Sequence, residues 1–206
     1  MGGCEEPPPA FFPAGQKVNR TPFDGPGTQP GPVFHALRAE FPRAIRGGWQ
    51  EPPFEVIVTA KDSVLKVARH LRETWGLDAL MDLTVVDYDG YQSERKPARF
   101  EVVWYLYSFV SHRRIRLKAP VPDTDPMVPT LTGLYASADW LEREAWDMFG
   151  IVFKGHPGLR RLLMYEEFSG HPLRKDYPLK GQQPRIGQLH PGVPPFGRRP
   201  KVLGGS

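Results

Sequence analysis

The sequence predicts a single α+β (α/β-type) domain, with a mostly antiparallel sheet of about four strands, packed helices and an extended C-terminal tail. Apolar residues recur at helical spacing in three segments and alternate with polar residues in others. The 206 residues, 40% of them hydrophobic, suffice for one core. The 24 prolines and 21 glycines gather toward the two ends. We therefore expect a disordered arm at 1–31, the globular domain at 32–153 and a basic, partner-binding extended tail at 154–206.

Two helices are predicted in the first half of the chain. Val33–Phe41 is the first, because Pro32 suits the start of a helix and Pro42 cannot continue one. Ser63–Trp75 is the second, because its apolar residues recur every three or four positions. Gly76 follows directly, and a glycine at this point commonly ends a helix in the left-handed conformation.

Four strands are predicted from runs rich in β-branched and aromatic residues, at 55–59, 81–88, 100–110 and 112–118. The last two are separated only around Ser111, which indicates a tight hairpin or a bulged bend. The proline-rich stretch 119–130 is expected to be a connection that crosses to the last helix.

A third helix is predicted from Asp139 to a stop at Gly150. Glu142 follows Asp139 by three positions, which is the spacing of a capping box. Arg143 and Asp147 are four residues apart, so we expect them to pair along the helix surface.

Glu144 is expected to be a buried carboxylate, because it falls between Trp140 and Met148 on the broad apolar arc of this helix. A buried carboxylate needs a cation or several hydrogen-bond donors. Two interpretations stay open: Glu144 pairs with a nearby arginine of the domain, or it anchors the basic segment that begins at Arg160 and Arg161. Both make Glu144 structural rather than catalytic.

The charge of the chain is divided unevenly. Residues 1–153 hold 17 Lys and Arg against 20 Asp and Glu, a balance of −3, whereas residues 154–206 hold 10 against 3, a balance of +7. Arginines with apolar neighbours and ordering prolines are typical of interface anchors, so the basic part is expected to bind an acidic groove of a protein partner. The predicted interface residues are Arg160, Arg161, His171, Arg174, Lys175, Asp176, Tyr177 and Leu179.

Three linked blocks then carry a resemblance to a known family: E-R-E-A-W-D-M-F-G-I at 142–151, G-H-P-G-L-R-R-L-L at 155–163 and G-H-P-L-R-K-D-Y-P-L at 170–179. Their order and close spacing resemble the signature of the 30 kDa (or C) subunit of respiratory complex I, the proton-translocating NADH:quinone oxidoreductase. The clear likeness covers about residues 130–178, and its structural signature residues are Glu142, Arg143, Glu144, Asp147, Gly150 and His156.

The resemblance implies a structural subunit of the hydrophilic arm whose tail lies across the 49 kDa-type quinone-site subunit, beside adjacent iron–sulfur subunits. It implies that FMN, the Fe–S clusters and the quinone are held by those partners, and that electrons pass from NADH to quinone in other chains. It further implies a peripheral place on the cytoplasmic side of a bacterial inner membrane, with membrane contact only through the complex.

The residues themselves favour a chain without catalytic, cofactor-binding or metal-binding residues. Cys4 is the only cysteine, so the usual ligation of an iron–sulfur cluster is excluded. No G-x-G-x-x-G motif or phosphate-binding loop is present. His156, His171 and His190 lie next to prolines without a zinc motif, so we expect histidines of this kind to fix turns and donate to backbone carbonyls.

Two other functions stay open at this point. The E-R-E block is also found in the equivalent subunit of membrane-bound hydrogenase or formate hydrogenlyase complexes, which the resemblance leaves as the alternative. A basic nucleic-acid-binding module is the more remote alternative, because the basic tail lacks regularly interleaved aromatic residues for base stacking and shows no recognition-helix pattern.

No apolar run is long enough for a membrane anchor, and the acidic Glu5 and Glu6 argue against a mitochondrial presequence.

Overall fold

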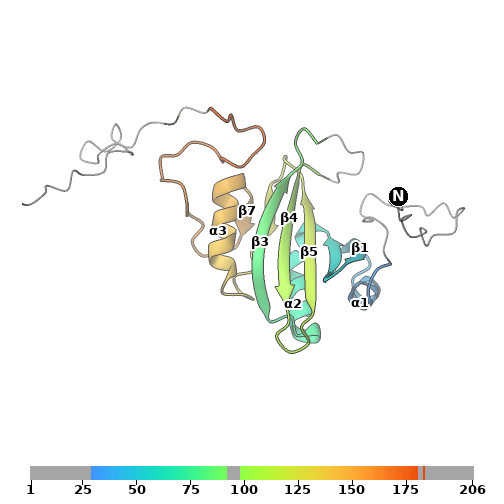
Figure 1. Cartoon of the computed structure of the whole chain (residues 1–206). Coiled ribbons are helices and arrows are strands. Elements are labelled where there is room, and N and C mark those ends of the chain that lie inside the picture. Colours follow the sequence, from blue (N-terminus) through green and yellow to red (C-terminus); the bar gives the residue numbers. More distant parts are fainter. Residues whose placement is uncertain (1–28, 92–97, 181–182, 184–206) are drawn as a thin grey trace, which may run out of the picture.

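A five-stranded sheet organises the protein, with strand order β1-β2-β5-β4-β3 (Figure 1). The computed structural model describes residues 29–91, 98–180 and 183, so the predicted N-terminal arm and His190 lie outside the described residues. Every neighbouring pair of strands is antiparallel except β2 and β5. The predicted α+β class is confirmed. The strands are β1 (Ile45–Glu51), β2 (Phe54–Thr59), β3 (Ala79–Asp87), β4 (Phe100–Tyr107) and β5 (Arg114–Val121).

The predicted helices are present, and they end where the sequence indicates. Helix α1 (Pro32–Glu40) begins with its proline in the first turn, and α2 (Val64–Trp75) follows a 3₁₀ turn at Lys61–Ser63. Gly76 and Gly150 close α2 and α3 (Ala138–Phe149) with φ of 64° and 80°, in the left-handed region that glycine adopts without strain.

The core lies between one face of the sheet and the helices. Alternate residues of β4 and β5 point to this face, so Phe100, Trp104 and Leu117 are fully buried, as is Leu71 of α2. Figure 1 shows α2 behind the sheet and the opposite face toward the viewer. That opposite face carries half-buried and exposed aromatic and basic side chains, and no helix among the described residues covers it. We call it the open face.

Three strands were not predicted, and each has a local reason. Strand β1 contains Gly47 and Gly48, which lack the side chains that mark a strand. Gly48 lets α1 approach, because a Cβ there would lie 2.4 Å from the Phe34 ring. The expected connection 119–130 is wrong: β5 continues to Val121, and β6 (Met127–Pro129) pairs in parallel with β7 (Val152–Lys154) in a separate two-stranded sheet.

Helix α3 lies beside β3 at one edge of the sheet (Figure 1). Two side chains that precede or begin the helix fix this position: the Ser137 hydroxyl donates to the Leu80 carbonyl at 2.8 Å, and the Tyr135 hydroxyl donates to the Leu77 carbonyl at 2.8 Å. The signature helix is thereby held against the domain on one side, and its other side faces the segment that follows β7.

Candidate functional site

Helix α3 buries two carboxylates and an arginine, but Glu144 is not one of them. Glu142 and Asp147 are fully buried and Arg143 is almost so, whereas Glu144 is exposed. The prediction of a buried Glu144 is wrong because Trp140, one turn earlier on the same side, is 59% exposed. The inward side of the helix is therefore rotated away from the apolar arc that the sequence suggested, and neither open interpretation of Glu144 holds.

Asp147 is the residue that anchors the basic segment. One carboxylate oxygen accepts a 2.6 Å bond from the Arg161 guanidinium, and the other accepts the backbone N–H groups of Leu162, Leu163 and Met164 at 2.8–3.0 Å. Successive N–H groups of this kind form an anion-binding nest. Burial alone would raise the pKa of Asp147, but these donors hold it below its usual value. Asp147 is therefore a structural anion rather than an acid–base group.

Arg143 does not pair with Asp147 as predicted; both residues bind the segment after β7 instead. The Arg143 guanidinium donates to the carbonyls of Arg160 and Arg161, at 3.3 and 3.2 Å, and stacks on Trp140 at 4.9 Å. Arg161 completes the network by donating to two further carbonyls, at Phe168 (2.6 Å) and Gly170 (3.2 Å).

A second cluster of charges holds the next part of the segment at the end of the sheet. Asp87, whose side chain is 1% exposed, accepts the Lys175 backbone N–H at 2.8 Å and contacts the Arg99 guanidinium at 3.3 Å. Asp176 pairs with Arg99 at 2.7 Å, and Arg174 pairs with Asp176 and with Asp123. Burial would raise the pKa of Asp87, but the N–H groups and Arg99 lower it.

These contacts correct the prediction that the basic segment after residue 153 leaves the domain as an extended tail. Residues 155–180 contain no helix or strand, but residues 160–177 lie against the domain through the two clusters instead of leaving it. We call residues 155–180 the clamped segment. The sequence does not reveal the roles of Asp87, Arg99 and Asp123, since they are distant in sequence from Lys175 and no local motif marks them. The division into domain and tail at residue 153 stays a prediction.

The two described Gly-His-Pro histidines contact backbone carbonyls, as predicted, and His156 also fixes a turn. His156 Nδ1 accepts the Gly158 N–H at 3.0 Å while Nε2 contacts the Asp139 carbonyl at 3.1 Å. His171 Nδ1 lies 3.0 Å from the carbonyl of Asp147. In the described part of the chain, no group of three or more His, Cys, Asp and Glu side chains could hold a metal ion.

Glu142 does not form the predicted capping box. Ser137 is the residue at the helix start, and Asp139 lies inside the first turn without a side-chain cap. The Glu142 carboxyl instead binds the loop before the helix, through the Leu131 N–H at 2.7 Å and the Thr130 hydroxyl at 2.5 Å. Burial raises the pKa of Glu142 from 4.5 to about 7, despite the opposing effect of these two donors.

Because of Glu142, the free energy of unfolding should fall as the pH rises toward and past the raised pKa of this carboxyl. Its folded-state pKa exceeds the unfolded value, so its contribution is fully present below pH 4.5 and is lost as the pH passes about 7. The loss is on the order of 3 kcal/mol. Urea unfolding of the full-length chain between pH 5 and 8 should show this decline, and Glu142→Gln should remove it. An equal decline in the variant would contradict the assignment to Glu142.

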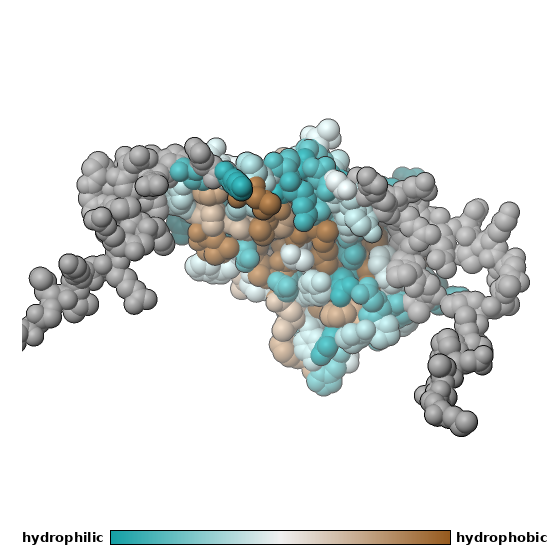
Figure 2. Space-filling model, turned by 45° about the horizontal axis from the view of Figure 1, so that its top comes forward, coloured by the Kyte–Doolittle hydropathy of each residue, from teal (hydrophilic) through white to brown (hydrophobic). Residues whose placement is uncertain are grey.

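The outward side of the clamped segment combines apolar and basic side chains. Leu163 and Leu173 are more than half exposed, and Leu179 is fully exposed. Arg160 and Lys175 are exposed as well, and no ion pair of their side chains occurs among the described residues. Figure 2 shows hydrophobic surface on the side of the molecule where α3 and this segment lie. Exposed apolar groups rimmed by charge mark a protein-binding surface.

The five other predicted interface residues face inward or contact the chain itself. Tyr177 stacks on Phe168 with ring centroids 5.9 Å apart, and its hydroxyl accepts a bond from Gln183 at 2.7 Å. The remaining four take part in the contacts given above, and they are Arg161, His171, Arg174 and Asp176.

Comparison with known proteins identifies the class to which this fold and segment belong. Residues 57–183 match the family model described as "Respiratory-chain NADH dehydrogenase, 30 Kd subunit". The chain belongs to this family. The match spans most of the sheet, α3 and the clamped segment, so the geometry described above is that of the family region.

Two curated relatives are each named as the C subunit of an NADH-quinone oxidoreductase. The protein of Citrifermentans bemidjiense is 48% identical over 66% of this chain and 83% of its own length, and that of Geobacter sulfurreducens is 46% identical with the same coverage. Among solved structures, a trypsin-resistant fragment of Nqo5 is 32% identical, with a TM-score of 0.55 over 62% of this chain and 96% of the fragment. The fold is shared by a chain of an archaeal membrane-bound sulfane sulfur reductase. That chain is 18% identical, with a TM-score of 0.57 over 72% of this chain and 85% of its own length.

This protein is accordingly a subunit of the hydrophilic arm of an NADH-quinone oxidoreductase, and the enzyme activity belongs to the complex. The hydrogenase alternative is not favoured, since the curated relatives named above are quinone oxidoreductase subunits. None of the described helices is long and apolar enough to cross a membrane.

Proposed function

We propose that this chain is a cofactor-free scaffold that joins the quinone-site subunit of the 49 kDa type to adjacent iron–sulfur subunits. In this role FMN, the Fe–S clusters and the quinone are bound by the partners, and electrons pass from NADH to quinone without entering this chain. The complex would hold it on the cytoplasmic side of the inner membrane, with membrane contact only through its partners.

The clamped segment is the observation that carries the proposal. Its backbone is fixed on the domain by Asp147 and Asp87, each of which accepts backbone N–H groups as well as an arginine. A segment that is ordered before binding loses less conformational entropy when it docks. The inward residues of the predicted interface thus serve to orient the outward ones, and direct contact with the partner falls to Arg160, Lys175 and Leu179.

The charge and shape of this surface fit a partner with an acidic rim and apolar pockets. Exposed leucines supply the apolar contact at Leu163, Leu173 and Leu179. The cations beside them, Arg160 and Lys175, supply the complementary charge and disfavour basic partners. Nucleic acid is a poorer fit, because the exposed large side chains of the segment are leucines rather than aromatic stacking platforms.

Charge reversal of the two outward cations should weaken assembly. The double variant Arg160→Glu with Lys175→Glu is expected to reduce the amount of quinone-site subunit that co-purifies with this chain by roughly tenfold, with a parallel loss of NADH:quinone activity. The measurement is recovery of the solubilised complex on a sizing column. Arg69→Glu, at an exposed arginine of α2, is the matched control. An intact and fully active complex from the double variant would overturn the proposal.

A further inference from the structure

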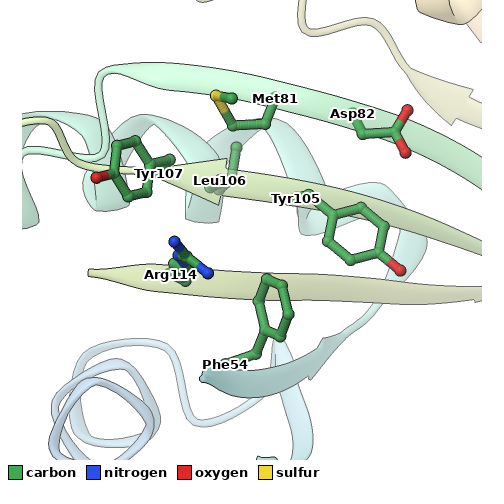
Figure 3. A pocket seen from close by; sticks show the side chains of 7 residues that line it. All are labelled: Phe54, Met81, Asp82, Tyr105, Leu106, Tyr107 and Arg114. Carbon is green, nitrogen blue, oxygen red and sulfur yellow. The ribbon is translucent and has the colours of Figure 1, made fainter. Parts of the chain in front are cut away.

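A hollow of about 460 Å³ lies on the open face, at the end of the sheet opposite the Asp87 cluster. Four strands supply its walls: Phe54 comes from β2, Met81 and Asp82 from β3, Tyr105 and Tyr107 from β4, and Arg114 from β5 (Figure 3). The Phe54 and Tyr105 rings meet edge to face, with centroids 5.6 Å apart. The hollow is thus a preformed, mainly apolar feature of the open face.

A β-bulge gives the hollow its exposed rim. The register between β3 and β4 shifts between Leu80 and Asp82, so Met81 has no partner residue and turns outward, 60% exposed, next to the outward Asp82. Bulges commonly re-aim a side chain in this way. Methionine is unbranched and polarizable, and it adapts to varied apolar partners. The bulge therefore places two successive side chains, Met81 and Asp82, on the open face between the buried Leu80 and Leu83.

The turn between β4 and β5 extends the same surface. Phe109 is 61% exposed and Val110 is 89% exposed, and the Phe109 ring packs edge to face on Tyr107, which lines the hollow. The Tyr107 hydroxyl lies 2.8 Å from Nδ1 of His112, whose backbone is left-handed with φ of 53°. The turn is thereby held in a strained conformation that keeps two large apolar side chains in solvent.

Charge indicates what occupies the hollow. Each of the next two cations along β5 has its own carboxylate at 2.9 Å, Arg116 with Glu51 and Lys118 with Glu101. Arg114 is exposed and stacks on Tyr107 at 5.8 Å, and no ion pair of its side chain occurs in the described part of the chain. An arginine beside an apolar hollow favours a ligand that combines an apolar group with a carboxylate.

The geometry points to a second docking surface, for a segment of another subunit of the complex that places an apolar side chain in the hollow and an adjacent Asp or Glu on Arg114. A polypeptide fits better than a small molecule, because the apolar surface continues from the hollow over Met81, Phe109 and Val110 instead of closing around it. The surface lies at the opposite end of β3 and β4 from the Asp87 cluster, so it does not depend on which subunit binds the clamped segment.

Photo-crosslinking in the assembled complex tests the surface. Met81→p-benzoylphenylalanine and Val110→p-benzoylphenylalanine place the probe on exposed positions, and Arg69→p-benzoylphenylalanine on α2 is the control. The crosslinked peptide is identified by mass spectrometry. We expect Met81 and Val110 to capture one segment of another subunit, with an acidic residue within a few positions of an apolar one, and Arg69 not to capture it. Arg114→Glu should then lower the crosslink yield roughly tenfold, and reversing the acidic residue of the captured segment should restore it.

The inference would be overturned by no crosslink to another subunit, by capture of residues 1–28 of this same chain, or by capture of a second copy. A captured segment without an acidic residue would overturn it too. Leu173→p-benzoylphenylalanine, placed on the clamped segment, separates the two proposals. Crosslinks from Leu173 without crosslinks from Met81 would contradict only the second surface, and the reverse pattern would contradict only the role of the clamped segment.

Discussion

Replacing Asp147 by Ala is expected to lower the free energy of unfolding by about 4 kcal/mol, because removal of one partner of a buried ion pair leaves the other uncompensated. Here the substitution would leave the Arg161 guanidinium and three backbone N–H groups without the carboxylate that they bind. Residues 160–170 should also detach from the domain and become sensitive to protease, whereas residues 174–176 stay held by the Asp87 cluster. Urea unfolding of the full-length chain and limited proteolysis measure the two effects.

Glu144→Ala is the matched control for this prediction. Glu144 is a carboxylate of the same helix, but it is exposed and takes no part in the network, so its loss should change stability by less than about 0.5 kcal/mol. Equal effects of the two substitutions would show that Asp147 has no special role. Asp147→Asn should fall between them, because an amide oxygen still accepts N–H bonds but carries no charge for Arg161.

Arg99→Ala is expected to cost about 3 kcal/mol, because it removes the cation beside the buried Asp87. Arg99 also contacts three more exposed carboxylates, which add less because solvent screens them. Its four partners are Asp87, Asp89, Asp123 and Asp176. The expected result is a less stable chain in which the Lys175 end of the clamped segment is released.

A double-mutant cycle with Asp87→Asn checks this second prediction. If Arg99 acts mainly through Asp87, the double variant should be less destabilised than the sum of the two single variants by about 1 kcal/mol or more, a coupling typical of residues in one network. Additive effects would contradict the proposed pairing. Lys66→Ala serves as the control, because this exposed lysine of α2 lies over the Phe41 ring and is not a partner of Asp87 or Arg99.

Local patterns were sufficient to predict the helices and most of the sheet. Apolar spacing and a following glycine located α2, and alternation located β3, β4 and β5 to within a few residues. The same signals did not predict β1, whose glycines have no side chains and so let Phe34 pack closely. They did not predict β6 and β7 either, because three-residue strands carry no measurable periodicity.

The types of residue that form the site could be predicted from the sequence, but the directions in which their side chains point could not. One of the two interpretations left open by the sequence had a carboxylate of α3 bind the basic segment, but it assigned this role to Glu144 where the structure has Asp147. The error arose because Trp140 was counted as a core residue, whereas its ring lies on the surface under the Arg143 guanidinium. Similarly, Arg174 and Asp176 have the composition of interface residues, but their partners Asp123 and Arg99 come from distant strands and connections.

The charge division acquires a structural meaning from these contacts. The excess of basic residues after residue 153 does not simply project toward a partner, since Arg161 and Arg174 are neutralised by carboxylates of the domain. What remains for a partner is the outward set, in which Arg160 and Lys175 accompany exposed leucines. The domain and the clamped segment therefore form one unit that presents a preorganised surface.

Hydrogen exchange in the isolated full-length chain shows whether the clamped segment is ordered before any partner binds. The N–H groups of Leu162, Leu163, Met164 and Lys175 are bound by Asp147 and Asp87 within the chain itself, so they should exchange much more slowly than unstructured backbone before any partner is present. Asp147→Ala should abolish protection at the first three and leave Lys175 protected. Exchange at the unstructured rate in the unmodified, isolated chain would show that the segment is ordered only by its partner, and would contradict the account.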